Sequence, residues 1–312
     1  MRARHRGRDR RPTSRLGARR WVLAASGATA LACVSLVALP AAQVAGGSAV
    51  TYVALGDSYT AGPLVPAQST NPLGCLRSDH NYPSDTAGAL GLSLVDMSCS
   101  GATTADMTGP QQVTPGPANP PQLGAIRAST RVVSLQIGGN DIGFVDIIEN
   151  CAAITPWGPT KVGLNCRDHY DPGGNDHLGA TIAALEPAVA AIIDQVHAQA
   201  PQAEVFVVGY PAILPASGSC WPSMPIEKGD AAYLRQKELQ LDDVLQSAAT
   251  QNGATYVDTY GASLTHDACA PESTRWVEPL VPDAPAAPVH PNAAGEAGMA
   301  ALLESAIRAT GI

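Results

Sequence analysis

Three polar segments each follow an apolar run of the kind that forms a β-strand, and a histidine lies near the C-terminus. The segments are Gly-Asp-Ser-Tyr at 56–59, Ser-Cys-Ser-Gly-Ala-Thr at 98–103 and Gly-Gly-Asn-Asp at 138–141. The histidine is His290, within Pro-Val-His-Pro-Asn just before the last expected helix. Because reactive groups in parallel α/β proteins lie beyond the carboxyl ends of the strands, we expect these four segments to meet at one edge of a sheet.

These residue types can transfer an acyl group. A serine hydroxyl is a weak nucleophile until a base within hydrogen-bond reach takes its proton, and an imidazole suits that task near neutral pH. The tetrahedral intermediate then carries an oxyanion, and each preorganised N–H donor that meets it is worth roughly 3 kcal/mol. We therefore predict that Ser58 is the nucleophile and His290 the general base. The predicted oxyanion hole consists of the Ser58 and Gly101 backbone N–H groups and the Asn140 side-chain amide.

Each motif by itself has a structural explanation. Gly-Asp-Ser alone is more often a turn with a helix cap, Gly-Gly-Asn-Asp is ordinary turn chemistry, and a lone histidine before a proline is commonly a surface residue. The conjunction of all three turns, in order, with a histidine before the final helix favours the functional interpretation. The chain contains no G-x-S-x-G elbow, no phosphate-binding glycine loop and no H-E-x-x-H pattern. The α/β-hydrolase, nucleotide-binding and zinc-protease classes therefore have no support.

The elements that must position these residues follow from hydrophobic periodicity. Apolar runs predict short strands, and longer segments with helical spacing predict helices. Strands alternating with helices indicate an α/β fold with a parallel sheet and helices on both of its faces. Long segments rich in proline and glycine predict rim loops. The predicted strands are 52–55, 92–97, 131–137, 205–209 and 255–258, the helices 178–200, 230–251 and 292–308, and the loops 109–121, 155–174 and 211–229.

Through these motifs the chain resembles the SGNH (GDSL) hydrolase family, and it is similar to the secreted bacterial lipases and esterases of that family. The resemblance covers residues 51–312. It implies Ser58 as nucleophile, His290 as base, and Ser58, Gly101 and Asn140 as the oxyanion hole. It also implies a three-layer α/β/α sandwich with a five-stranded parallel sheet, the flavodoxin-like fold of these hydrolases. Three disulfides paired in sequence order are a further implication.

One position departs from the family pattern. The family usually has an aspartate three residues before the histidine, and Ala287 stands there in this chain. Asp283 lies seven residues before His290, and Asp57 adjoins the nucleophile. An orienting acid must contact the imidazole nitrogen that faces away from the serine, which makes Asp57 a poor candidate. We therefore expect the backbone carbonyl of Ala287 to orient His290, so that a Ser58–His290 dyad carries the reaction.

The N-terminal residues 1–45 have the features of an export signal. Nine of the 19 Lys and Arg lie in the first twenty residues, and an uncharged stretch over 21–39 and then small residues follow them. The Arg19-Arg20 pair is also compatible with twin-arginine export. An uncleaved membrane anchor is the alternative, because the apolar run approaches spanning length. We expect cleavage, a secreted, extracellular protein, and a single catalytic domain over 46–312.

The rest of the chain is strongly acidic. Without its first twenty residues it has 10 basic and 26 acidic side chains, a net charge of −16. This balance disfavours nucleic acid, because binding it requires positive charge to neutralise phosphates. The expected partner is a small-molecule or lipid ester, with transient contact to a lipid surface, and the protein is expected to be a monomer. No cofactor and no metal is implied, because acyl transfer by an activated serine needs neither.

Six cysteines remain once Cys33, within the expected signal, is set aside. An even number in an exported chain favours disulfides. No C-x-x-C pair is present to indicate a structural zinc site. Several pairings are open to six cysteines, and we expect pairing in sequence order because it closes the shortest loops. The six are Cys75, Cys99, Cys151, Cys166, Cys220 and Cys269.

The leading functional hypothesis is hydrolysis of carboxylic esters outside the cell, with acyl lipids, phospholipids included, as substrates. Apolar rim loops at 64–66 and 213–215 would accommodate acyl chains. A carbohydrate acetylesterase is the alternative among enzymes, although aromatic residues at 4% offer few platforms for sugar rings. A secreted binding protein that keeps the fold without catalysis is the alternative outside enzymes. Loss of Ser58, His290 or the oxyanion donors would mark such a protein, and all of them are present.

Overall fold

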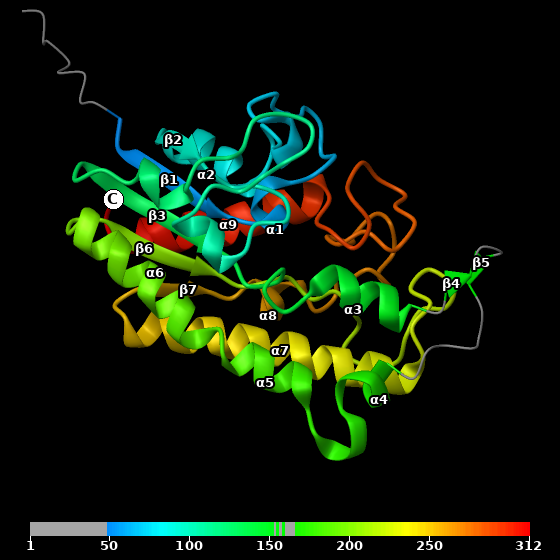
Figure 1. Ribbon diagram of the computed structural model, residues 1–312. Helices are drawn as coiled ribbons and strands as arrows, with labels where there is room; N and C mark the ends of the chain where they lie inside the picture. The colour runs from blue at the N-terminus through cyan, green and yellow to red at the C-terminus, as the bar shows by residue number, and fades with distance from the viewer. Residues whose placement is uncertain (1–48, 153, 156–157, 160–165) are drawn as a thin grey trace, which may run out of the picture. The chain divides into compact units, whose positions relative to one another are not determined.

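A computed structural model of the chain describes residues 49–152, 154–155, 158–159 and 166–312 (Figure 1). These residues belong to one compact unit, Gly47–Ile312. The expected export signal at 1–45, with Cys33, lies outside the described residues.

The described residues form a parallel sheet of five strands in the order β2-β1-β3-β6-β7. All five strands expected from the sequence are present, and each agrees with its predicted range to within one residue at either end. The strand order reverses direction between β1 and β3, and ligands of such sheets bind beside that switch point. The bounds are β1 Thr51–Gly56, β2 Ser93–Asp96, β3 Thr130–Gln136, β6 Glu204–Val208 and β7 Thr255–Val257. A separate antiparallel pair joins β4 (Ile154–Thr155) to β5 (Gly158–Pro159).

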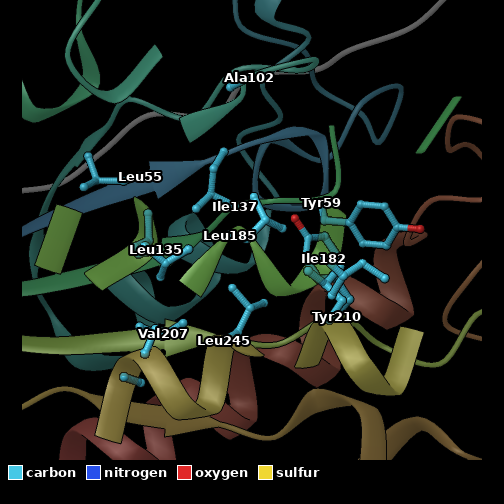
Figure 2. Packing of buried hydrophobic residues seen from close by; sticks show 14 of the residues in the cluster. Leu55, Tyr59, Ala102, Leu135, Ile137, Ile182, Leu185, Val207, Tyr210 and Leu245 are labelled. Carbon is cyan, nitrogen blue, oxygen red and sulfur yellow. The ribbon is translucent and has the colours of Figure 1, made fainter. Parts of the chain in front are cut away.

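Both faces of the sheet are buried. Side chains alternate between faces along a strand, so β6 directs Val205 and Val207 into one hydrophobic cluster and Phe206 and Val208 into another. This explains why the strands read as continuous apolar runs. The first cluster includes α5 (His177–Ala183), α6 (Glu186–Gln199) and α7 (Lys228–Gln251), and the second includes α2 (Tyr82–Leu90) and α9 (Ala293–Ala309). The fold is therefore the expected α/β/α sandwich (Figures 1 and 2).

The helix predicted over 178–200 is two helices. Pro187 lies in the first turn of α6 and lacks the N–H that would continue the hydrogen-bond ladder to Ala183. The combined stretch His177–Gln199 is long and apolar enough to cross a membrane by composition alone. Its apolar stripe, however, including Ile182 and Ile193, packs in the first hydrophobic cluster of the sheet. This stretch is therefore a core element of the sandwich.

The remaining elements are short and lie in the connections between the strands and the longer helices. The segment predicted as a loop over 155–174 contains a helix, because Cys166–Tyr170 forms one turn (α4). The segment predicted as a loop over 109–121 has no helix or strand, and the one predicted over 211–229 has none until α7 begins at Lys228, just before the predicted loop ends. The short elements are α1 (Ser58–Ala61), α3 (Phe144–Cys151), α8 (Thr259–Ser263), η1 (Leu73–Cys75), η2 (Thr104–Met107), η3 (Gln122–Ala125) and η4 (Pro172–Gly174).

Three disulfides join described cysteines in sequence order. They are Cys75–Cys99, Cys151–Cys166 and Cys220–Cys269. They close loops with sequence separations of 24, 15 and 49 residues, and a cross-link of this size stabilises a protein by roughly 3–4 kcal/mol in the chain-entropy account. The first lies beside the segment that carries Gly101, and the second ends α3, so both hold segments near the candidate site.

Candidate active site

Ser58 lies where the inner strand β1 turns into a short helix. Asp57 caps α1 by accepting the Tyr59 N–H at Oδ1, over 2.9 Å, and Ser58 is the first helical residue. The turn is tight at Gly56, because a Cβ there would lie 2.1 Å from Thr60 Oγ1 and 2.7 Å from the Gln136 carbonyl oxygen. Glycine is therefore required for β1 to end in this turn, at the carboxyl edge of the sheet.

His290 contacts the serine directly. Its Nε2 lies 2.8 Å from Ser58 Oγ, and its Nδ1 lies 2.8 Å from the carbonyl oxygen of Pro288. A carbonyl can only accept, so Nδ1 carries the proton and Nε2 presents its lone pair to the serine hydroxyl. The two ring nitrogens of His290 are thus arranged so that Nε2 can remove the proton of the Ser58 hydroxyl group.

The orienting carbonyl is that of Pro288, so the expected assignment to Ala287 was wrong by one residue. The Ala287 carbonyl accepts the backbone N–H of His290, over 3.2 Å, and closes the turn. Between the two, Val289 has a φ of 59°, which is rare for a β-branched residue and directs the Pro288 carbonyl towards the imidazole. Asp283 is paired with Arg275 instead, over 2.8 Å. The arrangement is a dyad with a backbone acceptor.

The residues after the histidine anchor its loop. Asn292 caps α9 by accepting the N–H groups of Ala294 and Gly295, and its own amide donates to Glu278 Oε1 over 2.6 Å. The Glu278 N–H in turn donates to the His290 carbonyl, over 3.0 Å. The segment therefore presents His290 from a fixed helix start.

Aromatic rings surround the imidazole. The rings of Tyr59 and Phe144 have centroids 4.9 and 5.9 Å from that of His290. The Tyr59 hydroxyl also donates to the Val289 carbonyl, over 2.6 Å. Burial among these groups lowers the pKa of His290, while the Pro288 hydrogen bond acts in the opposite direction. The imidazole is consequently neutral at pH 7 and available as a base.

The three predicted oxyanion donors are on neighbouring loops. Asn140 Nδ2 donates one hydrogen to the Ala102 carbonyl, over 2.8 Å, which places it beside Gly101 and leaves its second N–H for a ligand. Gly101 is exposed and has a φ of 80°. Within the described part of the chain, the backbone N–H groups of Ser58 and Gly101 have no acceptor. These donors are free to bind an anionic oxygen.

A pocket of about 740 Å³, open to solvent, begins at Ser58 and Asn140. Its walls are mainly aliphatic and aromatic side chains from α3, α5, α7 and the segment after β6. The rim residues expected at 213–215 contribute Ile213 and Leu214, whereas none of the residues 64–66 lines it. The apolar lining consists of Tyr59, Ile142, Phe144, Ile147, Ile148, Leu178, Tyr210, Ile213, Leu214, Ile226, Leu234 and Leu241.

Three residues of charged types, Asp57, Lys237 and Glu238, also line this pocket, and each has a hydrogen-bond partner. Lys237 Nζ contacts the Asp176 carboxylate and donates to Gln240 Oε1 over 3.0 Å. Glu238 Oε1 accepts the Ile213 N–H, over 2.9 Å. Burial raises the pKa of Glu238 well above its usual value, which favours the neutral form of this carboxyl group. The pocket wall therefore presents no unpaired charge to a bound molecule.

Sequence reasoning missed several residues of the site. Phe144 lies on α3, a helix that no pattern predicted, and Tyr210 immediately follows the Gly209 that ends a predicted strand. Tyr59 was within a quoted motif but had no assigned role. For the two tyrosines the available signal was their position, because Tyr210 directly follows a predicted strand and Tyr59 directly follows the motif serine. In the described part of the chain, no group of three or more His, Cys, Asp or Glu side chains could hold a metal ion.

The fold and this geometry together have the form of a serine ester hydrolase, with a serine–imidazole pair at the switch point of a parallel α/β/α sheet. Residues 54–297 match the GDSL-like lipase/acylhydrolase family. The chain belongs to this family. It is therefore a GDSL lipase/esterase, that is, a carboxylic ester hydrolase.

Individual relatives and solved structures agree with the family. Lipase 2 of Streptomyces coelicolor is 43% identical over 254 residues, which cover 80% of this chain and 83% of that protein. Among solved structures, phospholipase A1 from Streptomyces albidoflavus has a TM-score of 0.68 at 28% identity, with 83% of this chain and 99% of that chain covered. The extracellular lipase from Streptomyces rimosus has a TM-score of 0.64 at 26% identity, covering 83% and 100%.

Proposed function

We propose that this protein is a secreted lipase that hydrolyses fatty-acyl esters through an acyl-enzyme on Ser58, with His290 as general base. The observation that carries the proposal is the 2.8 Å contact between Ser58 Oγ and His290 Nε2 at the mouth of an apolar pocket. Phospholipids are included among the substrates, in keeping with the phospholipase A1 to which the chain is similar.

Acylation begins at the hydroxyl group of Ser58. His290 Nε2 takes the hydroxyl proton while Oγ bonds to the ester carbonyl carbon, and the carbonyl π electrons move to the oxygen. The Ser58 and Gly101 N–H groups and the Asn140 amide stabilise that oxyanion. When the tetrahedral intermediate collapses, the bond to the leaving alcohol breaks and His290 returns the proton to the alcohol oxygen. The acyl group remains on Ser58.

Deacylation repeats these steps with water. His290 Nε2 takes a proton from water, the hydroxide oxygen bonds to the acyl carbonyl carbon, and the same donors stabilise the second oxyanion. Collapse breaks the bond to Oγ and returns the proton to Ser58, which releases a carboxylic acid. The Pro288 carbonyl accepts from Nδ1–H throughout and stabilises the imidazolium that forms in each half-reaction.

The pocket supplies the preference for fatty-acyl groups. Each methylene transferred from water into an apolar site is worth about 0.8 kcal/mol, so chain length is recognised incrementally. The walls from α3 and α7 are mainly apolar, and burial favours the neutral form of the Glu238 carboxyl group. An acetyl group would contact few of these apolar side chains, which disfavours the acetylesterase alternative.

Export and assembly complete the proposal. Removal of residues 1–45 leaves the catalytic domain over 46–312 in an extracellular setting, where the three disulfides are stable. The protein acts as a monomer with transient contact to a lipid surface. The similarity to an extracellular lipase supports this location.

The test combines labelling with a chain-length series on the mature protein. A fluorophosphonate probe should label wild-type protein and Ser305→Ala, a control at an exposed serine of α9, but not Ser58→Ala. Among p-nitrophenyl esters, kcat/KM should be greater for medium and long acyl chains than for acetate, and acetylated xylan should be a poor substrate. Unchanged hydrolysis by Ser58→Ala would refute the mechanism, and a preference for acetyl groups would refute the substrate class.

A further inference from the structure

We propose that Tyr210 is a positioning residue whose hydroxyl group holds two catalytic segments in register. The two segments are the nucleophile turn, 56–59, and the oxyanion loop, 138–141. The inference rests on the proposed function, because it assigns Tyr210 a role within that site. Tyr210 is 4% exposed and follows β6, which is hydrogen-bonded to β3 in the sheet.

The Tyr210 hydroxyl group contacts both segments at once. It donates to Asp57 Oδ2 over 2.5 Å, and its oxygen accepts the Gly139 N–H over 2.9 Å. Asp57 precedes the nucleophile and Gly139 precedes the asparagine of the oxyanion hole. One phenol oxygen therefore joins the residues immediately before Ser58 and Asn140.

On the serine side, the contact acts through the helix cap. The Asp57 carboxylate accepts from Tyr59 N–H at Oδ1 and from Tyr210 at Oδ2, so the two oxygens have separate tasks. The first fixes the start of α1 and thereby the direction of Ser58 Oγ. The second prevents rotation of the carboxylate. Asp57 is 1% exposed, and no water is needed to hold its orientation.

On the oxyanion side, the glycine allows a close approach. A Cβ at Gly139 would lie 3.2 Å from the Tyr210 hydroxyl oxygen and 3.5 Å from Asp57 Oδ2. A side chain at this position would require the phenol to move by a few tenths of an ångström, so glycine favours the close approach of the backbone N–H to Tyr210. The position of Asn140 Nδ2 depends on this N–H, since Asn140 is the next residue.

Tyr210 is itself held rigidly. Its backbone N–H donates to Asp242 Oδ1 on α7, over 2.9 Å. Its ring packs edge-on against Tyr59, with centroids 5.1 Å apart and an angle of 77° (Figure 2). Tyr59 in turn donates to the Val289 carbonyl beside His290. Tyr210 thus links the sheet to the nucleophile turn and the oxyanion loop. Its packing against Tyr59 extends this link to the segment that carries His290.

A purely structural role is the competing explanation, because a buried phenol that loses its hydrogen bonds destabilises any fold. Tyr52 offers a matched control. It is fully buried on β1, and its hydroxyl lies 2.7 Å from Ser134 Oγ, within the second hydrophobic cluster and away from the site. Tyr52→Phe likewise removes the hydroxyl group of a buried, hydrogen-bonded tyrosine, here on a strand of the sheet.

The experiment measures kcat, KM and melting temperature for Tyr210→Phe, Asp57→Asn, their double variant and Tyr52→Phe. Tyr210→Phe should lower kcat by about 10- to 100-fold with KM within about twofold, because alignment of nucleophile and oxyanion donors acts mainly in the transition state. Asp57→Asn places an N–H where the phenol must donate, so it should cause a similar loss. The double variant should be no slower than the slower single variant, because both break one contact.

Tyr52→Phe should lower the melting temperature comparably and keep kcat within about twofold. The proposal is overturned if folded Tyr210→Phe keeps wild-type kcat, if its loss is in KM alone, or if Tyr52→Phe loses as much activity. Should Tyr210→Phe fail to fold, Asp57→Asn decides in the same way. Ser58→Ala distinguishes a failure of the proposed function from a failure of the positioning role. If Ser58→Ala remains active, the proposed function is overturned. If Ser58→Ala is inactive and Tyr210→Phe has wild-type activity, only the positioning role is overturned.

Discussion

Arg275 Nη1 donates to Asp283 Oδ2 over 2.8 Å, and the same nitrogen lies 3.6 Å from Glu278 Oε2. The nearest acid that precedes the proposed base His290 in the sequence is thus engaged with a guanidinium group. Because the Pro288 carbonyl already accepts from Nδ1 of His290, the imidazole has its orienting partner without a carboxylate. This relationship supports the proposed serine–histidine dyad and leads to the first two predictions.

Asp283→Asn should change kcat by less than about twofold, because the lost ion pair is half exposed on the Asp283 side and lies outside the reaction path. Steady-state kinetics on a p-nitrophenyl ester would measure this. A decrease near 10⁴-fold, of the order seen when a true triad acid is neutralised, would show instead that Asp283 orients His290 during turnover.

The pH dependence of kcat/KM should have an acid limb centred below about 6.5, the ordinary pKa of histidine. His290 must be neutral to act as a base, so activity is present above its pKa and is lost as pH falls through it. Burial lowers that pKa, and among the residues that the structure describes no carboxylate contacts Nδ1 to raise it. An acid limb centred well above 6.5 would contradict the dyad.

A second buried group in the site needs a control in that measurement. Burial raises the pKa of Asp57 from 3.8 to about 7, and its hydrogen bonds to Tyr210 and Tyr59 oppose this effect. If His290 governs the acid limb, Asp57→Asn should keep the midpoint of the limb although its rate is lower. If the acid limb is absent in Asp57→Asn, the limb reports the titration of Asp57 and not that of His290.

Asn140→Ala should lower kcat by roughly 10²–10³-fold while the protein remains folded, because it removes one oxyanion donor. The hydrogen bond to the Ala102 carbonyl is lost as well, so near- and far-UV circular dichroism should accompany the kinetics. A kcat close to that of the wild type would exclude the Asn140 amide from the oxyanion hole.

Ile147→Trp should shift the acyl preference towards short chains, because Ile147 is 7% exposed and lines the pocket. We expect kcat/KM for a long-chain ester to fall by about tenfold or more, with the value for a butyrate ester within about threefold of wild type. Val145→Trp on the same helix is the control, since Val145 is 58% exposed and does not line the pocket. Equal losses in both variants would indicate that the helix was merely disturbed.

Much of the fold was predictable because its signals are local. Each strand of the sheet is a short apolar run bounded by polar or glycine residues, and the alternation of strands and helices identifies the parallel sheet. Ser58 could be predicted as the nucleophile because it comes just after the first predicted strand, and His290 as the base because it comes just before the last predicted helix. The disulfide pairing followed from the sequence order of the six cysteines after the signal.

The unpredicted features depend on contacts distant in sequence or on a single backbone angle. Tyr210 meets Asp57 across 153 residues, and no pattern in either segment indicates the other. The choice of Pro288 over Ala287 depends on the left-handed conformation of Val289, which a β-branched residue rarely adopts. The break between α5 and α6 was visible at Pro187, but the apolar stripe on both sides of it outweighed that signal.

The central claim is that Ser58 carries the acyl group during turnover. Rapid acid quenching of the enzyme during hydrolysis of a p-nitrophenyl ester, followed by peptide mass spectrometry, tests it directly. We predict an added acyl mass on the peptide containing Ser58, and its absence in Ser58→Ala. An acyl adduct on another residue would contradict the account. So would a burst of product with no acyl adduct on the quenched protein.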